Sequence, residues 1–128
     1  MTTANVLIDS SGWIEYFGNG HKAQPYAKII KKHAGQSIIS SPIIIYEVFR
    51  RVKITFGEAK AGKAVAYIIS NSTIKDLDSR TALDAAKTST TSNLPMADSI
   101  IYSTAKLNNA TLITSDTHFK GMRGTQII

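Results

Sequence analysis

The sequence predicts an α/β fold in which helices flank a central parallel β-sheet of about five strands. Short apolar runs alternate with longer helical patterns along the chain, and polar or turn-forming residues separate the two. Because parallel strands need long crossover connections, usually helices, this alternation favours a sandwich of helices on both faces of a parallel sheet.

The five expected strands are short and apolar, and polar residues end them. They cover residues 5–8, 37–40, 72–75, 110–114 and 125–128. A continuous apolar run between turn signals is typical of a strand that is buried on both faces, as in a parallel sheet.

Helices are expected between the strands, and capping signals mark several of their ends. Ser41 followed by Pro42 is a cap with proline at the first helical position, and Gly57 marks the end of that helix. Ser79 is expected to cap a later helix, and Pro95 to open the next. The expected helices cover residues 13–17, 25–33, 43–56, 58–69, 79–90 and 95–108, with a short helical turn at 116–119.

Length and composition indicate one domain, residues 1–128, with a hydrophobic core. Hydrophobic residues make up 43% of the chain and charged residues 19%, which is unlike a disordered protein. The absence of cysteine excludes disulfides, thiol catalysis and cysteine-based metal sites. Without a signal-peptide pattern or an apolar run long enough to span a bilayer, the sequence predicts a soluble, cytoplasmic protein.

The chain is basic, with a formal net charge of +6 and a pI near 9.7. A basic surface attracts polyanions such as nucleic acids, although many basic proteins bind none. Only nine residues are acidic, so the positions of the carboxylates are informative.

Several carboxylates follow the expected strands. Asp9 comes directly after the first strand and Asp116 two residues after the fourth, while Glu47 lies in the second turn of the helix that follows the second strand. In open parallel sheets, ligands bind beyond the carboxyl ends of the strands. Asp98 lies in the first turn of the helix after Pro95, and the pattern leaves open which edge or flank of the sheet that turn approaches.

Each carboxylate also has an ordinary explanation. Asp9 and Asp116 could be helix caps, Glu47 could pair with Arg51 one turn away, and Asp98 could complement the helix dipole. Against this, helical spacing places both helix carboxylates beside apolar residues. Asp98 shares a face with Ile101, Tyr102 and Ala105, and Glu47 shares one with Ile44, Arg51 and Ile54.

Half-buried carboxylates that repel one another need a cation between them. Oxygen ligands suit Mg²⁺ or Mn²⁺ rather than zinc, and the hydroxyls of Ser10, Thr114 and Ser115 are close in sequence. The three histidines share no ligand spacing, and His118 is expected to be a surface residue.

Four segments resemble the motifs of PIN-domain proteins. They are residues 6–17, 45–51, 94–102 and 112–119, and they contain Asp9, Glu47, Asp98 and Asp116 in turn. Together with the length, the resemblance covers the whole chain, and the closest subgroup is the VapC-like toxins of prokaryotic toxin–antitoxin pairs.

The resemblance implies that the four acids meet in one pocket as catalytic residues and ligands of one or two Mg²⁺ or Mn²⁺ ions. The implied activity is endonucleolytic RNA cleavage that leaves a 5′-phosphate. Ser10, Thr114 and Ser115 would orient ligands or contact substrate, and the implied partners are a second copy of the chain and an antitoxin. Separately, basic residues are expected to contact the RNA backbone collectively: Arg50, Arg51, Lys120 and Arg123.

Three alternatives remain at this point. The first is a catalytically silent PIN module that binds RNA or forms complexes. The second is a Mg²⁺-binding phosphoacceptor domain, but such domains pair acids after the first strand, and Asp9 has no acidic neighbour before Glu15. The third is a flap-type DNA nuclease, which would carry more acids and long insertions.

Overall fold

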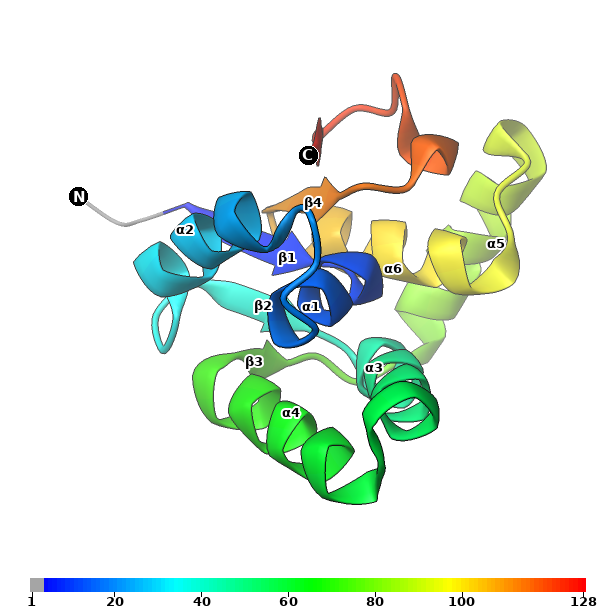
Figure 1. The fold of residues 1–128 in the computed structure, drawn as a ribbon. Coiled ribbons are helices and arrows are strands. Elements are labelled where there is room, and N and C mark those ends of the chain that lie inside the picture. Colours follow the sequence, from blue (N-terminus) through cyan, green and yellow to red (C-terminus); the bar gives the residue numbers. More distant parts are fainter. Residues whose placement is uncertain (1–3) are drawn as a thin grey trace.

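A five-stranded parallel sheet lies at the centre of the computed structural model, which describes residues 4–128 (Figure 1). The strands are β1 (Asn5–Ile8), β2 (Ile38–Ser40), β3 (Thr73–Ile74), β4 (Ala110–Thr114) and β5 (Thr125–Ile127), in the order β3-β2-β1-β4-β5. All neighbouring strands are parallel. The predicted α/β class and parallel sheet are confirmed; residues 1–3 of the predicted domain lie outside the described residues.

Six α-helices and one 3₁₀ turn connect the described strands. They are α1 (Ser10–Phe17), α2 (Ala23–His33), α3 (Pro42–Phe56), α4 (Glu58–Asn71), α5 (Ser79–Ser92), α6 (Met96–Leu107) and η1 (Thr117–Phe119). No helix among residues 4–128 combines the length and the apolar character needed to cross a membrane.

Several helix starts differ from the sequence prediction, including that of α2, which begins at Ala23 rather than at residue 25. Helix α1 begins at Ser10, three residues earlier than expected, because the Asp9 carboxylate caps it by accepting from the Gly12 N–H. The prediction that Ser79 caps α5 is wrong. Asp78 is the cap and accepts from the Thr81 N–H at 2.8 Å, so Ser79 is already the first helical residue.

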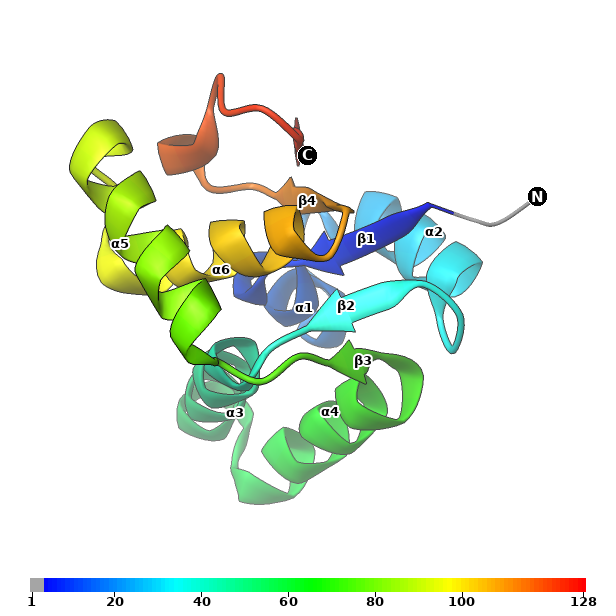
Figure 2. The same ribbon diagram turned by 180° about the vertical axis from the view of Figure 1, so that it is seen from behind.

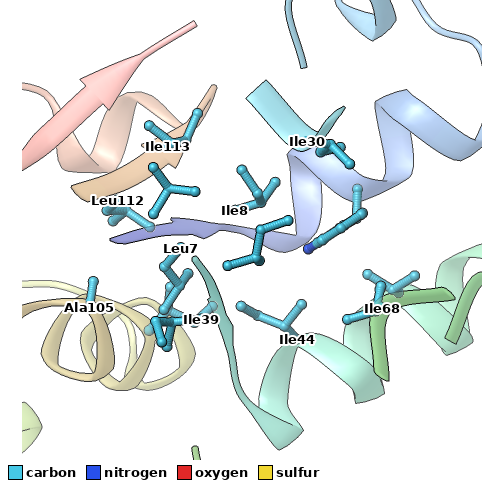
Figure 3. Packing of buried hydrophobic residues seen from close by; sticks show 14 of the residues in the cluster. Leu7, Ile8, Ile30, Ile39, Ile44, Ile68, Ala105, Leu112 and Ile113 are labelled. Atoms are coloured by element: carbon cyan, nitrogen blue, oxygen red, sulfur yellow. The ribbon is translucent and has the colours of Figure 1, made fainter. Parts of the chain in front are cut away.

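The core lies on both faces of the sheet, because successive side chains of a strand point to opposite faces. Figure 3 shows Ile8 and Ile113 on the same side of β1 as Ile30 of α2, and Leu7 on the other side with Ala105 of α6. Helix α6 lies in front of β1 and β4 in Figure 2, with α5 packed against its outer side. The sheet is thus covered by helices on both faces.

The parallel topology brings the starts of several helices to one edge. Strands β1, β2 and β4 end at the same edge, and α1 and α3 begin directly after β1 and β2. Helix α6 runs back against the strands, so its first turn lies near η1, at the edge toward which β1 and β4 point (Figure 1). Residues that follow these strands or open these helices are therefore close in space.

Candidate metal centre

Asp9 is buried where β1 gives way to α1. It is 4% exposed, and its own N–H donates to the Ile113 carbonyl at 3.1 Å, which joins the turn to β4. Its Oδ1 accepts from the Ser11 hydroxyl and from the Gly12 N–H at 3.2 Å, and its Oδ2 accepts from the Thr114 hydroxyl. Since a carboxylate has about four acceptor positions, these three donors fix Asp9 and leave about one position free.

Burial is the largest influence on the Asp9 carboxyl and raises its pKa. The hydroxyls of Ser11 and Thr114 and the Gly12 N–H oppose this rise by stabilising the ionised form, and the nearby charge of Asp116 adds to it. The donors offset the desolvation only in part, so a cation would further stabilise the charged carboxylate.

Asp116 is held by the turn that follows β4. Its N–H donates to the Thr114 hydroxyl at 3.0 Å, and its Oδ1 accepts from the His118 N–H at 2.9 Å and so caps η1. Thr114 is fully buried and donates its hydroxyl hydrogen to Asp9. One threonine hydroxyl thus links the carboxylate of Asp9 to the backbone of Asp116, the two acids that follow β1 and β4.

Asp98 lies beside Asp116, which answers the question that the sequence pattern left open. Its Oδ2 is 3.0 Å from Nδ1 of His118, and the same nitrogen is 3.2 Å from Oδ1 of Asp116. Burial raises the pKa of Asp98, His118 lowers it, and the Asp116 charge raises it further. The first turn of α6 therefore contributes its carboxylate to the strand-end edge.

Glu47 faces the same region from the second turn of α3. Its Oε1 is buried and has no hydrogen-bond partner within residues 4–128. Burial is the main cause of its raised pKa; Ser10 opposes the rise, and the charges of Asp98 and Asp9 add to it. No ion pair links Glu47 to Arg51 within the described chain, so the alternative of a solvated surface pair is not supported.

One detail of the predicted Glu47 face is wrong. Ile44 is fully buried as expected, but Ile54 is 67% exposed. The apolar side of α3 continues instead through Val48 and Val52, which are buried in the core. The buried side of α3 centres on Val48, and Ile54 lies six residues further on, which is about 600° of rotation or about 120° short of two full turns, so Ile54 has moved off the buried side.

Taken together, the four acids lie close enough to affect one another. Asp9 is influenced by Asp116, Asp98 by Asp116, and Glu47 by both Asp98 and Asp9. One ligand atom each of Asp98, Asp116 and His118 lies within 4.8 Å of the other two. Asp9 and Glu47 are outside this tightest group and would hold an ion through longer contacts or through water.

The donor set fits a divalent cation. Within residues 4–128, Glu47 has a buried carboxylate oxygen with no partner, and three carboxyls have raised pKa values; positive charge nearby would stabilise their ionised forms. Carboxylate oxygens suit Mg²⁺ or Mn²⁺, and a nitrogen from His118 would favour a transition ion over Mg²⁺.

The other predicted residues occupy three kinds of position. Ser11 rather than Ser10 donates to Asp9, whereas Ser10 lies by Glu47. The Ser115 hydroxyl shares a hydrogen bond with the Tyr26 hydroxyl at 2.6 Å. The four basic residues predicted to contact RNA are all exposed: Arg50, Arg51, Lys120 and Arg123.

Sequence reasoning missed three residues of this region. His118 was expected to be an ordinary surface residue, yet its ring contacts two of the acids; its position two residues after Asp116 was the available signal. Ser11, two residues after Asp9, was equally close in sequence. Tyr26 had no local signal, because only the packing of α2 brings its hydroxyl to the β4–η1 turn.

Residues 6–124 match the PIN domain family, so the chain belongs to that family. Its members are typically nucleases and use divalent metals. Comparison with curated proteins returned no match.

Several solved structures share the fold. A toxin–antitoxin complex from Klebsiella pneumoniae contains a chain that is 24% identical, with a TM-score of 0.78 and coverage of 95% of this chain and 96% of that one. A chain of VapBC2 from Rickettsia felis, bound to a promoter DNA fragment, is 17% identical, with a TM-score of 0.77 and coverage of 96% of each chain. VapC20 from Mycobacterium tuberculosis, a toxin that cleaves the sarcin–ricin loop, is 10% identical, with a TM-score of 0.73 and coverage of 84% of this chain and 85% of that one. These similarities show a common fold with VapC toxins.

Proposed function

We propose that residues 1–128 form one PIN domain that acts as a Mg²⁺- or Mn²⁺-dependent endoribonuclease, the toxin of a toxin–antitoxin pair in the cytoplasm. The observation that carries the proposal is the approach of Asp9, Glu47, Asp98 and Asp116 to one edge of the sheet, where Oε1 of Glu47 is buried with no partner in residues 4–128. These four residues are the proposed catalytic metal ligands.

The chemistry follows from the donors and their surroundings. A bound divalent cation would supply an acidified water and neutralise charge that develops on a phosphodiester. Thr114 and Ser11 orient the Asp9 carboxylate, and Thr114 also holds the Asp116 backbone. Exposed basic residues would attract the RNA backbone collectively, with binding that weakens as salt rises.

An antitoxin is the proposed protein partner, as the toxin–antitoxin complexes among the structural neighbours suggest. A groove of about 460 Å³ lies between the end of α1, the end of α3, and α4. Phe17, Phe56 and Tyr67 give it an apolar lining, and Lys60 and Lys63 give it positive charge. A segment with apolar and acidic side chains fits this groove. If the segment continued along α1, it would reach Asp9 after about 12 Å, the length of the helix from Phe17 at 1.5 Å per residue.

A homodimer is proposed on the resemblance to PIN toxins. Light scattering of the purified protein, alone and with its antitoxin, measures the number of copies in each state.

The alternatives are less well supported. In a phosphoacceptor domain, the Asp after the third strand would join the acid after the first. Here β3 is an edge strand, separated from β1 by β2, and Asp76 lines a different hollow with Lys75 and Arg80. The four acids and the orphaned Glu47 oxygen are more than a silent RNA-binding module requires, and the described helices and short loops contain no long DNA-gripping insertion.

The direct test compares RNA cleavage by the wild type, Asp98→Asn and Asp76→Asn. Asp76 is an exposed carboxylate away from the site, so it controls for the chemical change. Because metal assistance is worth several kcal/mol, Asp98→Asn is expected to lose roughly 100-fold or more of the rate. Purified proteins are incubated with total RNA or a DNA of matched sequence, with Mg²⁺, Mn²⁺ or chelator, and the new ends are mapped.

The expected pattern is cation-dependent RNA ends bearing 5′-phosphates from the wild type and Asp76→Asn. Cleavage that persists in Asp98→Asn or in chelator would refute the assigned chemistry. RNA binding without cleavage would favour the silent module, equal cleavage of DNA would favour the DNA nuclease, and labelling by acetyl phosphate would favour the phosphoacceptor domain.

A further inference from the structure

Tyr26 is a fully buried residue of α2 whose ring packs against the start of α1. A Cβ added at Gly12 would lie 2.3 Å from Cε1 and 2.7 Å from Cδ1 of Tyr26, and 2.8 Å from Cγ2 of Ile8. Such distances are far below normal contact, so glycine at position 12 is what allows the ring to lie there. The same Gly12 donates its N–H to Asp9.

The hydroxyl of Tyr26 reaches out of this packing to the turn after β4. It shares a 2.6 Å hydrogen bond with the hydroxyl of Ser115, a residue 89 positions away. Burial raises the pKa of the Tyr26 phenol, and the Asp9 charge raises it further, so the phenol stays protonated at neutral pH. A buried hydroxyl needs a partner, and Ser115 supplies it.

Ser115 lies between Thr114, which holds Asp9, and the candidate metal ligand Asp116. On one side, Thr114 donates to Asp9 and accepts from the Asp116 N–H; on the other, Asp116 carries its own carboxylate. The Thr114 contact fixes the turn from the side of β1. The Tyr26 contact fixes it from α2, an element that contributes no acid to the site.

We propose that Tyr26 is a positioning residue that holds the Thr114–Asp116 turn through Ser115 and so sets the place of the Asp116 carboxylate. The inference rests on the proposed metal site. It assigns to α2 a role in the site through a single phenol, while the ring of the same residue remains part of the core.

The ring and the hydroxyl of Tyr26 have separate contacts, so they can be tested separately. Tyr26→Phe keeps the ring that fills the space beside Gly12 and removes only the oxygen that reaches Ser115. The fold should therefore persist, while the turn loses its hydrogen bond to α2. Ser115→Ala removes the same hydrogen bond from the other side, and the double variant should add little to either single change, because both remove one interaction.

The test uses two readouts on the full-length protein. The first is hydrogen exchange of the Asp116 and His118 amides without metal, since both donate hydrogen bonds inside this turn. The second is the affinity for Mn²⁺, measured by electron paramagnetic resonance. Tyr16→Phe is the matched control, because it removes a half-buried phenol from the aromatic cluster of α1.

Tyr26→Phe and Ser115→Ala are expected to speed exchange of both amides several-fold relative to Tyr16→Phe, and to weaken Mn²⁺ binding by about 10-fold, as loss of groups that orient metal ligands does. Circular dichroism and the melting temperature should show that the folds are retained. Unchanged protection of these amides in Tyr26→Phe would overturn the proposal.

The two readouts separate this inference from the proposed function. If the wild type binds no Mn²⁺ or cleaves no RNA, the proposed function fails, while the amide measurement still decides whether Tyr26 holds the turn. If Mn²⁺ binds equally well to wild type and Tyr26→Phe although the amides are exposed, the turn is held by Tyr26 but does not set the Asp116 carboxylate, which also overturns the inference.

Discussion

Single residues carry the strongest physical evidence for a cation, and Glu47 is the clearest of them. Its Oε1 is buried without a partner among the described residues, and burial and the charges of Asp98 and Asp9 raise its pKa. A carboxylate in this position is held in the fold at a free-energy cost unless positive charge is added.

Glu47→Gln should therefore stabilise the protein when metal is absent. At pH 7 we expect the free energy of unfolding to rise by up to about 1 kcal/mol, because the substitution removes a charge from a half-buried group. The pKa of Glu47 is raised in the folded protein. The wild type is therefore most stable below the pKa of Glu47 in the unfolded chain, and it loses stability as pH rises through the folded-state pKa. The gain from the substitution should thus disappear toward pH 4.

The measurement is urea unfolding with and without Mg²⁺, using Glu58→Gln as a control because Glu58 is exposed and pairs with Lys53 at the surface. Mg²⁺ should stabilise the wild type more than Glu47→Gln. A metal-free Glu47→Gln protein that is less stable than wild type at pH 7 would contradict this account of the residue.

The sequence predicts which acids form the candidate site, but not which side chains contact them. Asp9, Asp98 and Asp116 could be located from strand ends and the motif strings, since those signals are local. The choice of Ser11 rather than Ser10 depends on how α1 begins, and the Nδ1 contacts of His118 depend on the approach of α6 to η1. Neither is encoded by spacing along the chain.

At the scale of elements, α6 carries the site carboxylate Asp98 at its start and is pinned to α5 at its end. Lys106 in its last turn donates to Asp84 of α5, with Nζ 3.0 Å from Oδ1 and 2.8 Å from Oδ2. This hydrogen bond is the main cause of the lowered pKa of Asp84. The pair lies at the opposite end of α6 from Asp98.

Asp84→Asn should destabilise the fold modestly, by about 0.5–1 kcal/mol at pH 7, because the pair is partly exposed. A lowered folded-state pKa means that the stabilisation is present above the unfolded pKa and is lost as pH falls through the folded value. Urea unfolding of wild type and variant at pH 7 and near pH 3.5 checks this. A gap that stays constant or widens in acid would count against the pair.

Element types could be predicted from the sequence, but some starts and placements could not. Hydrophobic period and turn residues gave the alternation of strands and helices. The N-cap of α5 was misassigned because Asp78 and Ser79 are both good caps, and only the hydrogen bond to Thr81 distinguishes them. The direction of α6 relative to the edge where the strands end depends on topology rather than on its own sequence.

At the scale of the whole molecule, the sheet order determines which chain segments meet. Because β1 lies between β2 and β4, the elements after these three strands are neighbours at one edge, while β2 separates β3, and with it Asp76, from β1. Alternation along the sequence predicts parallel strands but not their order, since several orders satisfy the same connections. The solved structures of similar fold share this overall arrangement over most of the chain, with TM-scores of 0.78 and 0.77.

The central claim is that four carboxylates from distant segments hold a divalent cation at this edge. Crystals soaked in Mn²⁺ and measured at a wavelength where manganese scatters anomalously would test it most directly. We expect a peak bonded to carboxylate oxygens of Asp98 and Asp116, with Asp9 and Glu47 reached directly or through water. A well-ordered site with no peak there, at millimolar Mn²⁺, would contradict the claim.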